Sequence, residues 1–194
     1  YKSRVIDESR LLTWELVEDQ KEADFICRLS GAELTVRDAT AALVPAADGR
    51  GSKEEAAPGL VRFGITGEES LQETLQAIGQ AEALRRLART IQRSQPPKEK
   101  GLVVSLMRDG RDISQDGVPR VRPGSLLGLE VRNDGRDPID VNVLYVDSRF
   151  KIHCLFPSEK NEDNRFRRDD RWVLPLRGGN ETLGRETFVI VAPT

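Results

Sequence analysis

The sequence predicts an α+β fold: a small α/β N-terminal half with one long amphipathic helix, followed by an antiparallel β-sandwich or open barrel. Three observations support this prediction. Apolar residues recur at helical spacing between residues 66 and 93, short segments after residue 101 alternate apolar and polar residues, and a polar segment with Pro96 and Pro97 separates the two regions. We therefore expect an α/β subdomain at residues 1–93, a proline-rich linker at 94–100 and an all-β domain at 101–194.

The N-terminal half contains three segments that are typical of short strands. They are Trp14–Val17, Phe25–Leu29 and Leu34–Arg37, and the tight turn Ser30-Gly31 joins the last two. Residues 39–59 are rich in Ala, Gly and Pro, so we expect a surface loop there.

The segment from about Glu68 to Arg93 is expected to form the long helix. Thr66 and Glu69 have the spacing of a capping box, and arginines gather in the last turns, where the helix dipole favours positive charge. Apolar residues at steps of three and four form one stripe: Leu71, Leu75, Ile78, Ala81, Leu84, Leu87 and Ile91. Because such a stripe needs a cover, we expect the helix to pack on the sheet of the N-terminal half.

The C-terminal half is expected to be almost wholly β. Gly and Asp turns separate the candidate strands, which are Leu102–Arg108, Ser125–Arg132, Ile139–Asp147, Phe150–Phe156, Arg171–Leu176 and Glu186–Ala192. Alternation predicts which residues of two strands share a face: Ile139, Val141, Val143 and Tyr145 on one, and Phe150, Ile152, Cys154 and Phe156 on the buried face of the next.

The composition argues against several classes of protein. The 194 residues include 30 basic and 32 acidic ones, and the net charge of −2 gives no overall field that favours nucleic acid or an anionic membrane. No apolar run approaches the roughly 18 residues of a membrane span, and the start does not resemble a signal peptide. Because the chain begins with Tyr1, we expect it to be a piece of a longer protein. Cys27 and Cys154 lie in apolar segments and are expected to be reduced and buried, in keeping with a cytoplasmic location.

His153 and Cys154 are the one adjacent pair of a base and a nucleophile. Neighbouring residues on a strand project to opposite faces, so the imidazole and the thiol are expected to point apart. His153 is also the single histidine of the chain, so no other imidazole can activate the thiol. The sequence therefore predicts no catalytic residues.

No segment predicts a metal or cofactor site either. The loop Asn161–Asn164 offers oxygen ligands, but it lacks the alternating carboxylates and central Gly of an EF-hand, and we expect a solvated loop. Gly178-Gly179-Asn180 has no following Lys and Ser, so it predicts a turn and not a phosphate-binding loop.

One segment is a candidate interaction surface, because its arginines are interleaved with aromatic residues. The candidate residues are Arg165, Arg167, Arg168, Arg171 and Trp172. Such a pattern is typical of anion or single-strand binding. The acidic residues Asp163, Asp169 and Asp170 lie among them and offset the positive field, which favours a salt-bridged turn between two strands.

Two stretches of the first half, Ala23–Leu29 and Ala81–Ala88, resemble the region that follows the protease domain in bacterial caspase-like peptidases of the metacaspase and orthocaspase group. The second half resembles the β domain of unknown function that often follows there. Its marks, in order, are Pro123-Gly124, the strand Val141–Asp147, Leu155-Phe156-Pro157, Asn164, Val173-Leu174-Pro175 and the terminal strand Gly184–Ala192. The turn Asp147-Ser148-Arg149 departs from the pattern, because it lacks the Gly often found there.

The resemblance implies a non-catalytic interaction or regulatory module from the C-terminal part of a caspase-like cysteine peptidase. In that family the catalytic His and Cys belong to the upstream protease domain, and no residue of this chain matches their motifs. The expected partner is that upstream domain or another protein, and no cofactor, nucleic acid or membrane is expected. The sequence does not indicate an oligomeric state. The alternative is a free-standing β module that binds a carbohydrate or an anion.

Overall fold

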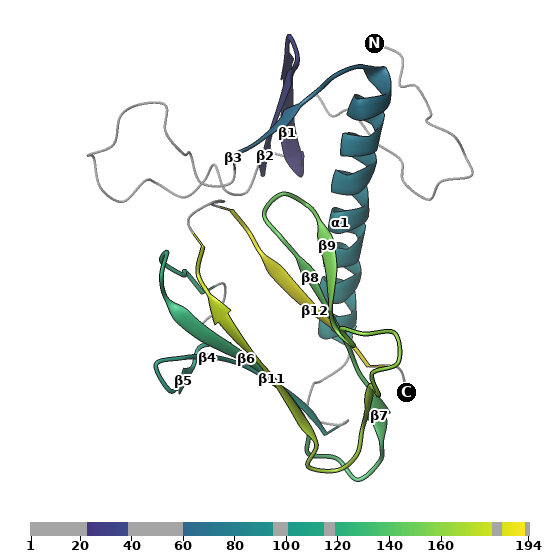
Figure 1. The fold of residues 1–194 in the computed structure, drawn as a ribbon, viewed down its shortest axis with the longest axis vertical. Coiled ribbons are helices and arrows are strands. Elements are labelled where there is room, and N and C mark those ends of the chain that lie inside the picture. Colours follow the sequence, from purple (N-terminus) through teal and green to yellow (C-terminus); the bar gives the residue numbers. More distant parts are fainter. Residues whose placement is uncertain (1–22, 39–59, 95–100, 115–118, 180–183, 193–194) are drawn as a thin grey trace. The chain divides into compact units, whose positions relative to one another are not determined.

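A computed structural model describes residues 23–38, 60–94, 101–114, 119–179 and 184–192. In these residues the fold is α+β and mostly β, with several antiparallel sheets, none of which closes into a barrel (Figure 1). In the part of the chain that the structure describes, no helix combines the length and the apolar character needed to cross a membrane. The predicted strand Trp14–Val17, the loop at 39–59 and most of the 94–100 linker lie outside these residues.

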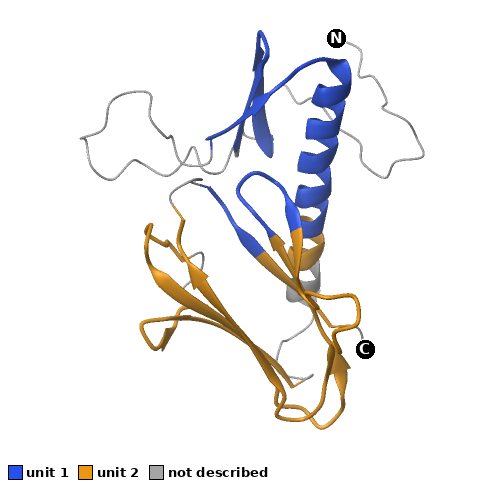
Figure 2. Cartoon of the chain, viewed as in Figure 1, with its two compact units in different colours: residues 1–84, 146–152, 182–187 blue, residues 85–145, 153–181, 188–194 orange. Residues whose placement is uncertain are grey.

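The chain divides into two compact units, which Figure 2 colours blue and orange. Unit 1 comprises residues 1–84, 146–152 and 182–187. Unit 2 comprises residues 85–145, 153–181 and 188–194. The segment 146–152, which lies in the C-terminal half of the sequence, is therefore part of the first unit.

Unit 1 contains a three-stranded antiparallel sheet of order β1-β2-β3. Its strands are β1 (Phe25–Ser30), β2 (Glu33–Asp38) and β3 (Leu60–Gly64). The predictions of β1 and β2 are confirmed. β3 was not predicted, because its five residues follow directly on the segment interpreted as a loop. Register places Val36 of β2 between Cys27 of β1 and Val61 of β3, so the inner face of this sheet is built around Val36.

The long helix α1 (Glu68–Ser94) is confirmed. Its first backbone hydrogen bond runs from the Leu71 N–H to the Gly67 carbonyl at 3.1 Å. Gly67 is therefore the N-cap, one residue later than the predicted capping box. The first turn carries Glu68 and Glu69, whose negative charge suits the positive end of the helix dipole.

The core of unit 1 confirms that the helix covers the N-terminal sheet. Buried Ile78 and Ala81, both with exposed fractions of 0%, pack with Leu34 and Val36 of β2. Leu71, Leu75 and Leu84 pack against the same cluster from the helix. The prediction of the stripe is wrong at Leu87, which is 56% exposed, and the side chain of Ile91 lies outside the described residues.

A hairpin tip from the second half of the sequence completes this core. Val146 and Phe150 are buried in it, and the Phe150 ring meets the Phe25 ring edge-on with centroids 5.3 Å apart. Phe150 has a φ of 64°, a left-handed conformation that costs a bulky residue about 1–3 kcal/mol. The side chain of Asp147 holds the turn, since its Oδ1 accepts the N–H groups of Arg149 and Lys151, both at 2.8 Å.

Unit 2 contains a four-stranded antiparallel sheet of order β11-β6-β4-β5 (Figure 1). Its strands are β4 (Leu102–Arg108), β5 (Arg111–Asp112), β6 (Leu126–Asn133) and β11 (Arg171–Arg177). The predictions of β4, β6 and β11 are confirmed to within one residue. The two-residue strand β5 is too short for any alternation to predict it.

A second sheet has the order β12-β8-β9, with β8 (Asn142–Val146), β9 (Ile152–Phe156) and β12 (Thr187–Val191). Each of these three strands has one end in unit 1. The predicted strand at 139–147 is broken at Val141, whose N–H bonds the Asn164 carbonyl at 2.8 Å. The break separates β7 (Ile139–Asp140), which pairs with β10 (Arg165–Phe166), from β8.

Residues from both sheets share the core of unit 2. Its buried members are Leu129, Val131, Val141, Val143, Phe156 and Phe166. The Phe156 ring lies at its centre, with its centroid 5.5 Å from those of both Phe166 and Trp172.

The predicted burial of β9 is wrong at two positions. Ile152 is 43% exposed and Cys154 is exposed, whereas Phe156 is buried as predicted. The reason is that β9 lies at the edge of its sheet, where only its last residues reach the core. The prediction that Cys27 is buried is also wrong, because it lies on the edge strand β1 and is exposed. Both cysteines are free, in agreement with the prediction that they are reduced.

Candidate functional site

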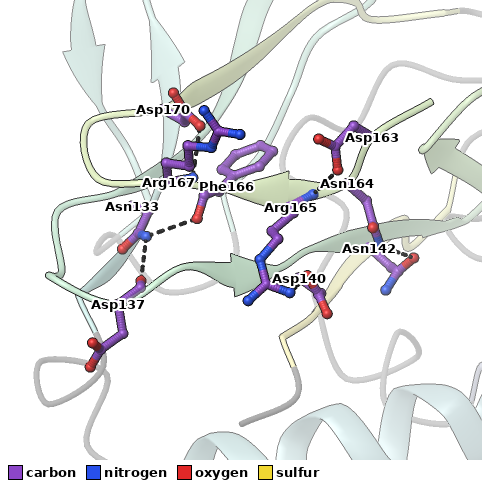
Figure 3. Close-up of polar contacts among 10 residues, drawn as sticks. All are labelled: Asn133, Asp137, Asp140, Asn142, Asp163, Asn164, Arg165, Phe166, Arg167 and Asp170. Atoms are coloured by element: carbon purple, nitrogen blue, oxygen red, sulfur yellow. Dashed lines mark hydrogen bonds and ion pairs between the residues drawn. The ribbon is translucent and has the colours of Figure 1, made fainter.

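The candidate arginines lie on and after β10 in a turn that leads into β11, here called the arginine turn (residues 163–171; Figure 3). Asn133, at the end of β6, anchors this turn and is fully buried. Its Nδ2 donates to the Asp137 carbonyl at 2.9 Å and to the Phe166 carbonyl at 3.1 Å, and its Oδ1 accepts the Gly135 N–H at 2.9 Å. One buried side chain therefore joins the β6–β7 connection to β10.

The acidic residues of the arginine turn mainly hold its backbone. Asp163 Oδ1 accepts the Arg165 N–H at 3.0 Å, and Asp170 Oδ2 accepts the Arg167 N–H at 2.7 Å. The left-handed φ of 67° at Asp169 lets its N–H reach the Asn133 carbonyl at 2.8 Å. These bonds explain why aspartates recur in this segment.

Two ion pairs join side chains of the turn. Arg165 lies 3.7 Å from Asp140 on the paired strand β7, and Arg168 lies 3.8 Å from its neighbour Asp169. All four side chains are well exposed, so each pair contributes at most about 1 kcal/mol. The arrangement is that of the predicted salt-bridged turn, with the guanidinium groups facing solvent.

The structure does not bring Trp172 to the surface that carries the arginines. Residues of β11 alternate between exposed and half-buried positions, with Arg171 exposed and Trp172 directed to the core against Phe156. The exposed part of the candidate surface therefore consists of Arg165, Arg167, Arg168 and Arg171. Whether this surface binds anything stays a prediction.

His153 and Cys154 point to different partners. The Cys154 thiol donates to the Pro157 carbonyl at 3.4 Å and lies 3.7 Å from the Phe156 carbonyl. The His153 ring lies against the Tyr145 ring, with centroids 5.7 Å apart. At the other cysteine, partial desolvation raises the pKa of the Cys27 thiol although the residue is exposed overall, and this lowers the fraction of reactive thiolate at neutral pH.

The oxygens of the loop Asn161–Asn164 form turns instead of a ligand set. The Glu162 carboxylate accepts hydrogen bonds from the N–H and the hydroxyl of Ser158, which lower its pKa. Asn164 Nδ2 donates to Asn142 Oδ1 at 3.3 Å. Within the described ranges, no group of three or more His, Cys, Asp and Glu side chains could hold a metal ion.

The arrangement of the four-stranded sheet exposes an apolar surface that the sequence analysis missed. Strand register places Val173 and Pro175 of β11, Leu126 of β6 and Val103 of β4 on the side of the sheet that faces away from the core, here called the outer face. Leu126 is 68% exposed and Val173 is 49% exposed. The motif Val173-Leu174-Pro175 was noticed in the sequence, but alternation alone does not reveal which side of a strand is covered.

Comparisons of the chain with protein-family models, with curated proteins and with solved structures found no match. The caspase-like resemblance therefore remains a prediction from the sequence.

Proposed function

We propose that this chain is a non-catalytic interaction module that accompanies a caspase-like cysteine peptidase. The observation that carries the proposal is the outer face, where Leu126, Val173 and Val103 of three neighbouring strands are exposed, with the charged Glu130 and Arg132 of β6 on the same side. Exposed aliphatic side chains among polar ones are typical of protein–protein contacts that are not obligate. Arg171 and Arg177 at the two ends of β11 lie on this same face.

The proposed architecture of the C-terminal half is an antiparallel β-sandwich. Support comes from the core of unit 2, to which β6 and β11 of one sheet and β8, β9 and β12 of the other contribute side chains. In a sandwich of this kind the inner faces build the core and the outer faces remain available for contacts.

The proposed lack of catalysis is supported by the placement of Cys154 and His153. The thiol is directed to main-chain carbonyls and the imidazole to an aromatic ring, so neither activates the other. The purified chain is expected to hydrolyse none of the Arg-, Lys- and Asp-directed peptide substrates. Turnover that disappears in Cys154→Ala would overturn this part of the proposal.

The association with a peptidase is tested through the reading frame upstream of Tyr1. If it encodes a caspase-like domain, that domain is expected to bind the chain, and the variants Leu126→Asp and Val173→Asp are expected to abolish binding. Val191→Asp, at a comparably exposed valine on β12, is the matched control and should bind normally. The absence of a caspase-like domain, or equal binding by all variants, would contradict the proposal.

The alternative is a β module that binds a small ligand, and the exposed guanidinium groups of the arginine turn favour an anion. A carbohydrate is less well supported, because Trp172, whose ring could stack on a sugar, is directed to the core. Calorimetric titration with inorganic phosphate and with sulfated oligosaccharides separates this function from the first. Saturable binding lost in Arg167→Gln would favour the alternative.

A cytoplasmic location completes the proposal. It is supported by the two cysteines, which are free and exposed, as is usual in a reducing compartment.

A further inference from the structure

Five arginines from three separate segments of the chain meet at one end of the four-stranded sheet. At this end β4 and β11 finish and β6 begins, and all five residues belong to unit 2. We call this group the basic end; its members are Arg108, Arg111, Arg120, Arg122 and Arg177.

Two of the three segments are joined by the β4–β5 hairpin and a direct hydrogen bond. Arg108 and Arg111 are directly opposite each other in the hairpin register. The guanidinium Nη1 of Arg108 donates to the Arg120 carbonyl at 3.1 Å. Arg120 therefore lies beside the hairpin, although eight residues separate it from Arg111 in the sequence.

The third segment is attached through two glycines. The Gly124 N–H donates to the Gly178 carbonyl at 2.8 Å, and the Gly178 N–H donates to the Ser125 carbonyl at 2.9 Å. Gly178 packs so closely that an added Cβ would lie 2.6 Å from the Arg122 carbonyl oxygen. This contact keeps Arg177, the residue before Gly178, close to Arg122.

The basic end carries an excess of positive charge in a chain whose net charge is negative. Two acidic residues, Asp109 and Asp112, accompany the five arginines within residues 108–112, 120–125 and 177–179. The Asp112 carboxylate accepts the Ser114 N–H at 2.9 Å, and the hydrogen bonds from Ser114 lower its pKa. It is therefore ionised at neutral pH, and the excess remains positive with its charge included.

The basic end is continuous with the outer face. Arg177 is opposite Leu126 in the β11–β6 register, and Leu126 is the most exposed of the large apolar residues described. Val121, between Arg120 and Arg122 in the chain, is also exposed. Arg177 and Leu126 thus lie side by side on the outer face, whereas the register places Arg108 and Arg111 on the opposite side of the sheet, with Leu127.

We propose that this surface binds an acidic, aliphatic segment of a partner protein. Carboxylates of the segment pair with Arg177 on the outer face and with the neighbouring Arg122, and its aliphatic side chains cover Leu126 and Val173 on that face. This inference rests on the proposed function as an interaction module and specifies the chemistry of the partner. Arginine favours carboxylate recognition, because its planar group donates two parallel hydrogen bonds.

A nucleic acid fits this surface less well. Single strands are bound by aromatic side chains on which the bases stack. The large apolar side chains that are exposed in the described residues are all aliphatic, including Val121, Leu126 and Val173.

The test measures fluorescence anisotropy of labelled peptides with the full chain. The probe is a peptide of alternating Asp and Leu. In one comparison peptide Lys replaces Asp, and in a second Ser replaces Leu. A single-stranded oligonucleotide is the fourth ligand. We expect the Asp–Leu peptide to bind most tightly and its affinity to fall with added salt. The combined variant Arg122→Gln and Arg177→Gln, and separately Leu126→Ser, should each weaken binding about tenfold.

The matched control is Arg136→Gln with Lys160→Gln, which removes the same charge from exposed positions elsewhere in the same unit. It should leave binding unchanged, and circular dichroism checks that all variants keep the parent fold. Tighter binding of the oligonucleotide, equal binding of the Ser-containing peptide, or loss of binding in the control would each overturn the inference. If the caspase-like domain binds through Leu126 while no acidic peptide does, the interaction function stands and only this inference fails.

Discussion

Removing the side chain of Phe150 should destabilise unit 1 strongly, although Phe150 lies far along the sequence from the rest of that unit. It is 5% exposed, and its ring meets Phe25 at 5.3 Å with an interplanar angle of 82°. Phe150→Ala is expected to lower the free energy of unfolding by about 3–5 kcal/mol. About 0.5–1.5 kcal/mol of that loss belongs to the edge-to-face contact, and a double-mutant cycle with Phe25→Ala should recover it as a coupling energy.

A glycine variant at this position separates the loss of the side chain from the strain of the left-handed backbone, two effects that alanine alone would combine. Because Phe150 has a φ of 64°, an alanine there keeps the left-handed strain, whereas a glycine relieves it. Phe150→Gly loses the same side chain as Phe150→Ala, and its loss of stability should be about 1 kcal/mol smaller. The opposite order would mean that the left-handed turn is not present in the folded protein.

Urea unfolding followed by circular dichroism measures these changes, because α1 dominates the helical signal. Hydrogen exchange in residues 68–84 reports the same core directly, and protection there should fall in Phe150→Ala. Ile152→Ala is the matched control two residues away; its side chain is 43% exposed, so it should cost less than about 1 kcal/mol. If both alanine variants cost the same, or if Phe150→Ala stays within about 0.5 kcal/mol of the parent, the reasoning is refuted.

Three further predictions concern the helix, the buried amide and a titrating loop. Ile78→Ala should lower the free energy of unfolding by about 2–5 kcal/mol, because the Ile78 side chain is 0% exposed. Leu87→Ala should lower it by less than about 0.5 kcal/mol, because Leu87 is 56% exposed. Equal losses of stability in thermal unfolding would show that a different side of the helix faces the core. Asn133→Asp places a carboxylate against two main-chain carbonyls, which raises the pKa of the introduced group above its unfolded value. The variant should therefore be strongly destabilised at neutral pH and should partly recover stability as the pH falls below that raised pKa. A loss of stability that does not depend on pH would contradict this account. Hydrogen bonds from Ser158 lower the pKa of Glu162, so the stability that this carboxylate contributes is present above its unfolded pKa and disappears as the pH falls through the folded one. In an NMR titration Ser158→Ala should raise that pKa part of the way, since the backbone N–H donor remains, and an unchanged pKa would contradict the assignment of the hydroxyl as a donor.

Most of the local elements could be predicted from the pattern of residues alone. The helical spacing of apolar residues fixed α1 to within a turn, and alternation located β1, β2, β4, β6 and β11. These patterns are informative because a helix or strand that covers a core must repeat its apolar residues with its own period. Strand geometry also predicted that the side chains of His153 and Cys154 point apart, because neighbouring residues of a strand project to opposite sides. In the structure the two side chains contact different partners.

Tertiary structure alone decided which of the alternating faces are covered. Ile152 and Cys154 have the phase of buried residues but lie on an edge strand, and Phe150 turns into the core of unit 1 through a left-handed backbone. The period of a strand shows that its two sides differ, and it does not show whether anything packs on either side.

The candidate binding surface was likewise outside the reach of the sequence. Arg122 lies 14 positions after Arg108, and Arg177 lies 55 positions after Arg122, so no short local window contains all three. They meet because β4 and β11 both pair with β6 in antiparallel register, which aligns the ends of the first two strands with the start of the third. Long-range strand pairing, which depends on the whole core, therefore created the surface to which a partner is proposed to bind.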